Sequence, residues 1–321
     1  MKKTMLLLLI LIVTLVLGAC TSGREGRDRP IIMTTLFPQY DIVRSLAGDY
    51  VDVVFLPPLG TDVHNYEPTP SRQVQILNAD MLIYTGDDME PWVNKYIRVE
   101  ANEWLRIVDV SERVDLIEGH HNHNDTHDDH DTHDDHDHHH GDYDPHIWHD
   151  PLNVIIMVEH IRDELIALLP DYETSITDNA AIYIGELQDL HTMFLDLVEH
   201  GELDIIMHGG HNVIGYFIHR YNLRYVNPYR GFSADAEPTP GALANMIDTM
   251  NHHDIEHLFS EKLIPQTVAD VLREETGAEI LYLYAGENIG VDEFHAGVTF
   301  LDMLRHNYDQ YRIGLKYDGD N

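Results

Sequence analysis

The feature that most constrains the fold is a repeated alternation of short apolar runs with amphipathic helical segments. In the first half of the chain the apolar runs are typical of buried strands, and the stretches between them carry apolar residues at helical spacing. The predicted strands are residues 31–35, 51–56, 81–85 and 106–110, and the predicted helices are residues 38–48 and 71–79. Strands that alternate with helices predict a mostly parallel sheet with helices on both faces.

The second half of the chain repeats this plan. Strands are predicted at 204–209, 223–226, 255–260 and 279–284, and helices at 212–221, 241–250, 265–277 and 298–308. A short repeat, EPTP, occurs at 67–70 and at 237–240, each time before a predicted helix. In both copies a Thr stands at the expected N-cap and a Pro at the first helical position. The shared context supports two related α/β lobes.

A long helical segment connects the two halves. Residues 151–170 and 174–201 have strong helical patterns, and only Pro170 and Asp171 interrupt them. We therefore predict an N-terminal lobe at 31–173, a linker helix at 174–200 and a C-terminal lobe at 201–321. A helix is a stiff connector, so we expect the lobes to rock slightly rather than to close widely.

The N-terminus has the pattern of an export signal. Two lysines precede an apolar run, residues 5–17, that is short for a membrane span, so residues 1–19 are predicted to be a signal peptide rather than an uncleaved anchor. The sequence LGAC resembles the lipobox of bacterial lipoproteins, and Cys20 is the only cysteine. No intrachain disulfide can form, and lipidation of Cys20 would explain the lone thiol. Residues 20–30 are then a tether, and the protein is expected on the extracellular face of the membrane.

The charge of the chain excludes some partners. Its formal net charge is −36. Such a chain will not bind nucleic acid through phosphate contacts, and it will not lie flat on an anionic membrane. The charge is typical of a protein that is soluble outside the cell, and it attracts cations weakly over the whole surface.

The composition of a segment rich in His and Asp indicates metal binding but does not define a single site. Ten of the 24 histidines lie in residues 120–140, which contain THDDHD twice in tandem. The segment 119–143 has almost no apolar residues, so we expect it to be disordered. A flexible array of this kind binds several ions loosely. We interpret it as a labile zinc-collecting loop, the alternative being a charged surface loop with no role.

Four better candidates for metal ligands lie at or near the carboxyl ends of predicted strands. These are His64 in GTDVHNYEPTP, His146 in DPHIWHDP, His211 in HGGHNVIGYF and Glu287 in YAGENIG. Ligands gather at this edge of open α/β sheets, and each half of the chain supplies two of the four. Three imidazoles and a carboxylate make a tetrahedral set suited to Zn²⁺. Four protein ligands leave no position for a reactive water, which favours carrying a metal over catalysis.

Other histidines give weaker signals. His149 and His208 lie close to His146 and His211 in the sequence and are either spare ligands or neighbours. The order His253, Glu256, His257 matches an inverted zinc-protease signature, which requires both histidines on one helix. Here the first is predicted in a turn and the last on a strand, so a zinc-dependent hydrolase is disfavoured.

Several motifs together resemble the bacterial solute-binding protein 9 family, the metal-binding lipoproteins of zinc and manganese ABC importers. They are GTDVHNYEPTP, DPHIWHDP, GGHNVIGYF with RYNL, PYRGFSADAEPTP and GVTFLDMLRHN, in family order over about residues 30–310. The resemblance implies two α/β lobes joined by a long helix, with the metal between them. It places His64, His146 and His211 on three ligand positions, and Glu287 aligns with the acidic form of a variable fourth.

The resemblance also implies the metal and the function. Zinc members carry His at the position of His211, where manganese members carry Glu, and the His-rich insertion points the same way. The expected function is the extracellular component of a zinc ABC importer, a monomer without enzymatic activity that delivers Zn²⁺ to a permease driven by an ATPase. The alternatives are a manganese-specific member and a surface adhesin. The fourth ligand is left open among Glu287, His149, His208 and water.

Overall fold

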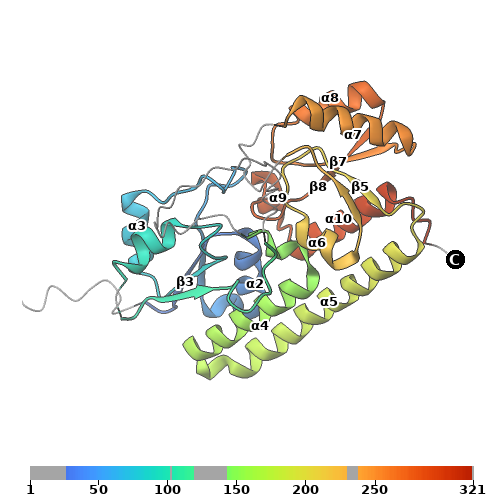
Figure 1. The fold of residues 1–321 in the computed structure, drawn as a ribbon. Coiled ribbons are helices and arrows are strands. Elements are labelled where there is room, and N and C mark those ends of the chain that lie inside the picture. Colours follow the sequence, from blue (N-terminus) through green and yellow to red (C-terminus); the bar gives the residue numbers. More distant parts are fainter. Residues whose placement is uncertain (1–26, 102, 119–142, 230–237, 320–321) are drawn as a thin grey trace, which may run out of the picture.

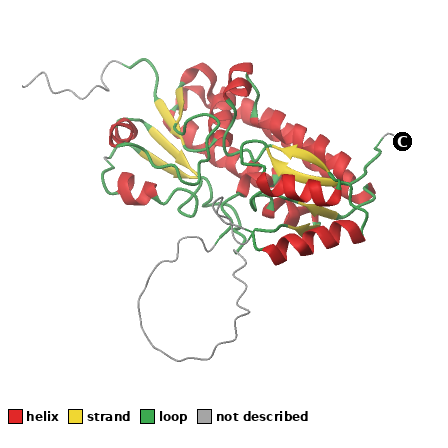
Figure 2. Ribbon diagram, turned by 90° about the horizontal axis from the view of Figure 1, so that it is seen from above, coloured by secondary structure: helices red, strands yellow, loops and turns green. Residues whose placement is uncertain are grey.

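The computed structural model describes residues 27–101, 103–118, 143–229 and 238–319. Within them, strands and helices alternate along the chain, and the strands gather in two groups with helices around them (Figures 1 and 2). The predicted α/β class with two lobes is confirmed. The predicted signal peptide, Cys20, most of the tether and nearly all of the His-rich segment lie outside the described residues.

The N-terminal lobe is built on one parallel sheet. Its strands are β1 (Ile31–Thr34), β2 (Asp52–Phe55), β3 (Met81–Tyr84) and β4 (Arg106–Asp109), in the order β2-β1-β3-β4. All four coincide with predicted strands to within one residue at each end. The side chains of β3 alternate between two hydrophobic clusters, Met81 and Ile83 in one and Leu82 and Tyr84 in the other, so both faces of this sheet are covered.

The two predicted helices of this lobe form, with ends within two residues of the prediction. The two are α2 (Phe37–Ala47) and α3 (Pro70–Leu77). Gly48 ends α2 with a φ of 50°, a left-handed value that favours glycine. Thr69 caps α3 by accepting a hydrogen bond from the backbone N–H of Arg72, as predicted from the first EPTP copy.

Two long helices connect the lobes and pack side by side (Figure 1). They are α4 (Pro151–Leu168) and α5 (Glu173–His200), separated by the short helix η4 (Pro170–Tyr172). The buried side chains of α5 recur every three or four residues: Ile176, Ala180, Tyr183, Leu187, Leu190, Phe194 and Leu197. Its contacts run from α2 in the N-terminal lobe to the helices of the C-terminal lobe. The exact lobe boundaries at 173 and 201 stay a prediction.

The C-terminal lobe contains two pairs of parallel strands. They are β5 (Ile205–Met207) with β6 (Arg224–Val226), and β7 (His257–Glu261) with β8 (Glu279–Leu283). The pairs are joined by a parallel bridge between His208 and Phe259, and the Gly209 N–H donates to the Phe259 carbonyl at 2.8 Å. The carboxyl ends of β5 and β7 therefore lie next to each other.

In the described part of this lobe, five helices accompany the strands. They are α6 (Gly215–Tyr221), α7 (Pro240–His252), α8 (Thr267–Thr276), α9 (Val291–Ala296) and α10 (Phe300–Gly314). Of these, α8 and α10 pack against both β7 and β8. Thr239 caps α7 in the same way as Thr69 caps α3. The sequence pattern did not predict α9 or the π-helix η2 (Val93–Arg98). Both are only six residues long, and such short elements show too little periodicity to be recognised. No helix in the described part of the chain has the length and apolar character to cross a membrane.

Candidate metal centre

Three histidines from distant segments meet at the carboxyl-edge loops of the two lobes. His64 lies in the loop after β2, His146 directly precedes the short helix η3 (Ile147–His149), and His211 lies between β5 and α6. Each offers a ring nitrogen, and these three atoms all lie within 4.8 Å of one another. His146 and His211 are buried and His64 is half-buried. This is the only such group among the described residues.

The spacing of the three rings suits one small cation. The Nε2 atoms of His64 and His211 are 3.1 Å apart, and the ring centroids of the three pairs lie between 5.1 and 5.7 Å. Two nitrogens bound to one Zn²⁺ at about 2.0–2.1 Å in tetrahedral geometry lie roughly 3.3 Å apart. The arrangement thus needs only small ring movements to bind an ion.

His146 is fixed by its own short peptide. Asp144 accepts from the His146 backbone N–H at 3.0 Å, and its Oδ1 lies 2.8 Å from Nδ1 of the same residue. Trp148 anchors the peptide by donating from Nε1 to the Ala285 carbonyl at 2.7 Å. A Cβ at Gly215 would lie 2.3 Å from Oδ2 of Asp144, so the glycine at the start of α6 makes room for this carboxylate. The contact between Asp144 and Nδ1 fixes the orientation of the ring, so Nε2 is the nitrogen that can bind a metal.

His211 faces a second buried carboxylate through its other nitrogen. Its Nδ1 lies 3.0 Å from Oε1 of Glu261, the last residue of β7. Burial disfavours the charged imidazole, but the Glu261 carboxylate outweighs burial, so the pKa of His211 is raised above its ordinary value. For His146, burial and the neighbouring histidines lower the pKa well below its ordinary value. Because a metal binds the neutral imidazole, the lowered pKa of His146 favours metal binding and the raised pKa of His211 opposes it.

The loop that carries His64 is joined to the loop that follows Glu287. Asn288 donates from Nδ2 to the carbonyls of Pro58, at 2.9 Å, and Thr61, at 2.7 Å. The Gly60 N–H also donates to the Ile289 carbonyl at 2.8 Å. These bonds run between segments of the two lobes and hold the His64 loop over the other two histidines.

The predicted fourth ligand, Glu287, lies near this group but is not part of it. It follows β8, is 8% exposed, and its Oε2 has no hydrogen-bond partner among the described residues. Burial raises its pKa to about 7, and His211 acts in the opposite direction. A Cβ at the preceding Gly286, whose φ is +89°, would lie 3.1 Å from Trp148 and Phe300, so the turn requires glycine. Glu287 as a ligand stays a prediction.

His149 and His208, the two other candidate ligands, are buried next to the group of three histidines. His149 is 5% exposed, and burial lowers its pKa to about 3. His208 is fully buried, with Nδ1 3.0 Å from Oη of Tyr225 and Nε2 3.6 Å from Oε1 of Glu261. Neither belongs to the group of converging ring nitrogens.

Sequence reasoning missed the two carboxylates that face the histidines. Asp144 could have been found, because a carboxylate two residues before a candidate ligand can reach its ring. Glu261 had one usable signal, its place at the carboxyl end of a predicted strand, but the predicted strand stopped at residue 260.

The arrangement of the inverted protease motif is as predicted. His253 is the C-cap of α7, and His257 is the first residue of β7. The two histidines do not share a helix face, so the motif does not make a zinc-protease site.

Comparison with known proteins agrees with this geometry. The family model described as zinc-uptake complex component A, periplasmic (ZnuA), matches residues 32–313. The zinc-binding lipoprotein AdcA of Streptococcus pneumoniae is 30% identical over 313 residues, which is 96% of this chain and 60% of the relative. This chain thus spans three fifths of that protein. The high-affinity zinc uptake system protein ZnuA of Bacillus subtilis is 29% identical over 320 residues, 98% of each chain.

A solved structure is similar over most of the chain. The Zn(II)-bound ZnuA-like domain of S. pneumoniae AdcA superposes with a TM-score of 0.73 at 27% identity, covering 89% of this chain and 99% of that domain. The family model covers far more than half of the sequence, and the fold and the motif order agree with it. The chain belongs to the ZnuA family of zinc-uptake components, within the solute-binding protein 9 group that its motifs resemble.

Proposed function

We propose that this protein is the extracellular zinc-binding component of a zinc ABC importer. The observation that carries the proposal is the convergence of His64, His146 and His211 from both lobes onto one point. In this proposal the three imidazoles bind the ion through Nε2 and Glu287 supplies the fourth ligand. The names of the relatives, a zinc-binding lipoprotein and a zinc uptake protein, support the same metal.

The chemistry of the ligands favours capture and release over catalysis. Imidazole nitrogens suit zinc, whereas manganese prefers sets rich in carboxylate oxygen. A set of four protein ligands leaves no position for a metal-bound water, so the ion is carried rather than used. With α5 as a stiff connector between the lobes, release to the permease would need only a small rocking movement that separates His64 and His146 from His211.

The location and the partners follow from the same proposal. Cleavage before Cys20 and lipidation of its thiol would anchor the chain at the outer face of the membrane, next to the permease and its ATPase. The first relative is named a lipoprotein, which supports the anchor. The protein would act as a monomer, because the three histidines of the group all come from one chain.

Zinc titration of single-site variants tests the proposal. We expect the chain from residue 21 onward to bind one Zn²⁺ tightly in competition with a chelator, and His64→Ala and His211→Ala to lose that site. His219→Ala is the matched control, because His219 is exposed on α6 and lies outside the group. Tight binding that survives both ligand substitutions would refute the assignment.

The His-rich segment 119–143 has a separate role in this proposal, as a store of loosely bound ions. Deleting residues 120–140 should leave one tight zinc and reduce the number of weakly bound ones. Calorimetric titration of the deletion variant measures both numbers. If the tight site disappears with the segment, the defining site lies in the segment rather than between the lobes.

A further inference from the structure

Glu261 occupies an unusual position for a charged side chain. It is 1% exposed at the end of β7, both of its carboxylate oxygens are buried, and Oε1 lies 3.0 Å from Nδ1 of His211 and 3.6 Å from Nε2 of His208, two residues that follow β5. Gly210 is packed against it: a Cβ there would lie 1.6 Å from Oε2. Any side chain at position 210 would displace the carboxylate. The backbone is therefore arranged to admit Glu261 at this place.

The contacts of His211 fix which nitrogen can bind a metal. Its Nε2 faces Nε2 of His64 at 3.1 Å, and its Nδ1 faces Oε1 of Glu261 at 3.0 Å. A neutral imidazole that offers the Nε2 lone pair carries its proton on Nδ1. A carboxylate at Nδ1 accepts that proton in a hydrogen bond and so holds both the tautomer and the ring orientation.

His208 approaches the same carboxylate from the other side. Its Nδ1 contacts Oη of Tyr225 at 3.0 Å and the amide nitrogen of Asn227 at 3.2 Å. The orientation of that amide follows from its oxygen, which accepts from the Tyr229 backbone N–H at 2.8 Å. An amide nitrogen only donates, so Nδ1 of His208 faces a donor, and its Nε2 lies 3.6 Å from Oε1 of Glu261.

We infer that Glu261 is a positioning residue for the metal site, placed against Nδ1 of His211 so that the Nε2 lone pair of His211 points at the ion. The inference rests on the proposed zinc function and extends it to a residue that does not touch the metal. His208 lies beside the same carboxylate, with Nε2 3.6 Å from Oε1, and borders it rather than serving as a spare ligand.

The pair of Glu261 and His211 parallels the pair of Asp144 and His146. In both, a carboxylate that is at most 1% exposed meets Nδ1 of a buried histidine, at 2.8 Å for Asp144 and 3.0 Å for Glu261. Asp144 comes from the same peptide as its histidine, whereas Glu261 comes from a different strand. The position of His211 therefore depends on the packing of β5 against β7. Through its contact with His211, Glu261 makes the geometry of the metal site depend on that packing.

The test compares Glu261→Gln with Glu261→Leu. Gln keeps the size of the side chain and an oxygen that accepts the Nδ1 proton, whereas Leu removes the acceptor. We expect Leu to lower zinc affinity by about 10- to 100-fold, as for other partners of metal-bound histidines, and Gln to recover part of the loss. Glu279→Leu is the matched control, because Glu279 is exposed at the start of the neighbouring strand β8.

A spectroscopic readout separates positioning from general destabilisation. At saturating Co²⁺, the visible absorption reports the number and geometry of the ligands. A variant that is merely less stable gives the wild-type spectrum once saturated, whereas a misplaced His211 changes it. We expect a changed spectrum for Glu261→Leu and a nearly wild-type spectrum for Glu261→Gln and Glu279→Leu.

The outcomes distinguish this inference from the proposed function. Wild-type zinc affinity and a wild-type Co²⁺ spectrum in Glu261→Leu would overturn the role of Glu261, even if His211→Ala abolishes tight binding. If the wild-type chain itself binds no zinc tightly, the proposed function fails first. Gln and Leu variants that are equally impaired would show that charge rather than hydrogen bonding matters, and the positioning role would be wrong.

Discussion

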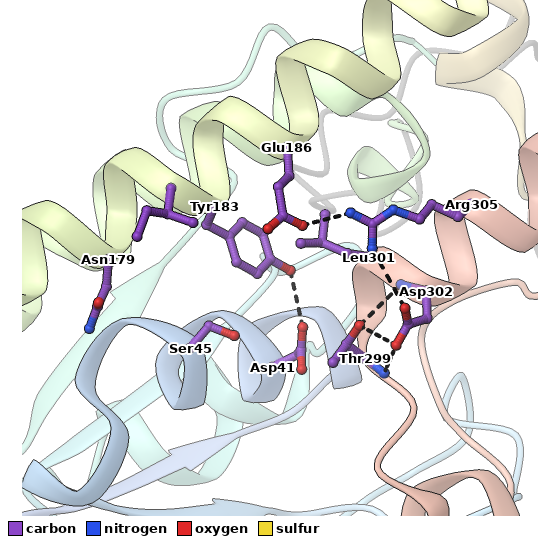
Figure 3. Close-up of a pocket in the computed structure, with 10 residues that line it drawn as sticks. Asp41, Ser45, Asn179, Tyr183, Glu186, Thr299, Leu301, Asp302 and Arg305 are labelled. Carbon is purple, nitrogen blue, oxygen red and sulfur yellow. Dashed lines mark hydrogen bonds and ion pairs between the residues drawn. The ribbon is translucent and has the colours of Figure 1, made fainter.

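Two of the places where the lobes meet are held together in different ways. At the metal centre, Nε2 of His64 and Nε2 of His211 approach to 3.1 Å from opposite lobes. At the second place, Oδ2 of Asp41 on α2 accepts a hydrogen bond from Oη of Tyr183 on α5 (Figure 3) and another from the Phe300 N–H at the start of α10, each at 3.1 Å. A single carboxylate there joins the N-terminal lobe, the linker helix and the C-terminal lobe.

The Asp41 junction borders a pocket that opens to the surface and is lined by the same three helices. The pocket measures about 370 Å³, and Figure 3 shows Glu186 of α5 paired with Arg305 of α10 at its edge, with a distance of 2.7 Å. Both side chains of that pair are more than 40% exposed, so the pair contributes little to stability. The buried hydrogen bonds of Asp41 are the stronger connection.

The comparison shows two ways of joining the lobes. At Asp41, Oδ2 accepts from two buried donors, so these hydrogen bonds join the lobes without any ligand. Two imidazole nitrogens that face each other need a proton or a cation between them, so an ion that binds there stabilises the contact between the lobes. We therefore expect zinc to change the stability of the molecule through the metal centre and to leave the Asp41 junction unchanged.

Removing the metal should have the largest effect. An ion present at a thousand times its Kd stabilises the folded state by about 4 kcal/mol, because it binds only the folded chain. Chelation should therefore lower the melting temperature by roughly 10 °C, and added zinc should restore it. Calorimetry of one sample with chelator and then with zinc measures this. An unchanged melting curve would mean that the stability contributed by the metal centre, like that of the Asp41 junction, does not depend on zinc.

Removing one imidazole should have the next largest effect. A structural zinc site binds with about 10–16 kcal/mol, so one of four ligands accounts for roughly 3 kcal/mol, or about a 100-fold change in Kd. His64→Ala should lower zinc affinity by this amount and leave the stability of the metal-free protein nearly unchanged, because His64 is only half-buried. Competition with a chromophoric chelator gives the affinity. A large loss of metal-free stability would show that His64 also supports the fold.

Breaking the Asp41 junction should give the opposite pattern. Asp41→Ala leaves Oη of Tyr183 and the Phe300 N–H without their acceptor, and each buried group without a partner costs about 1–3 kcal/mol. We expect a loss of about 2 kcal/mol in the free energy of unfolding, the same with and without zinc. Ser45→Ala, one turn further along α2, is the control. A selective loss of zinc affinity in Asp41→Ala would show that the two junctions are coupled.

The smallest effect is a pH dependence at Asp41. Burial raises the pKa of this carboxyl above 3.8, so the folded chain holds the proton more tightly than the unfolded chain. The stability that protonation contributes is complete below 3.8 and is lost as the pH rises through the folded-state pKa. Asp41→Asn removes the titration, so its stability relative to wild type should increase with pH, by about 1.4 kcal/mol for each unit of pKa shift.

Denaturant unfolding of the metal-free proteins at several pH values measures this difference. Two other charged groups, Arg44 and Asp302, lie near Asp41. They are the same in both proteins, so their effect on the pH dependence cancels in the comparison. A constant difference across the pH range would mean that Asp41 does not titrate differently in the folded chain.

Much of this molecule could be predicted from local sequence. The strands of the N-terminal lobe and the caps Thr69 and Thr239 were found because periodicity and capping are local properties. The convergence of His64, His146 and His211 was also predicted, because ligands gather at the carboxyl ends of parallel strands. The π-helix at residues 93–98 was missed, because a six-residue element leaves no periodic pattern.

The sequence by itself determined the class of fold, the family and which three histidines come together. Each of these depends on residues close together in the chain or on motifs of fixed order. Only the tertiary structure decided that Glu261 meets His211 and that Asp41 joins three helices, because those contacts depend on which strand lies beside β5 and where α10 begins. Neighbours of this kind come from distant parts of the chain, and no local pattern records how closely folding brings them together.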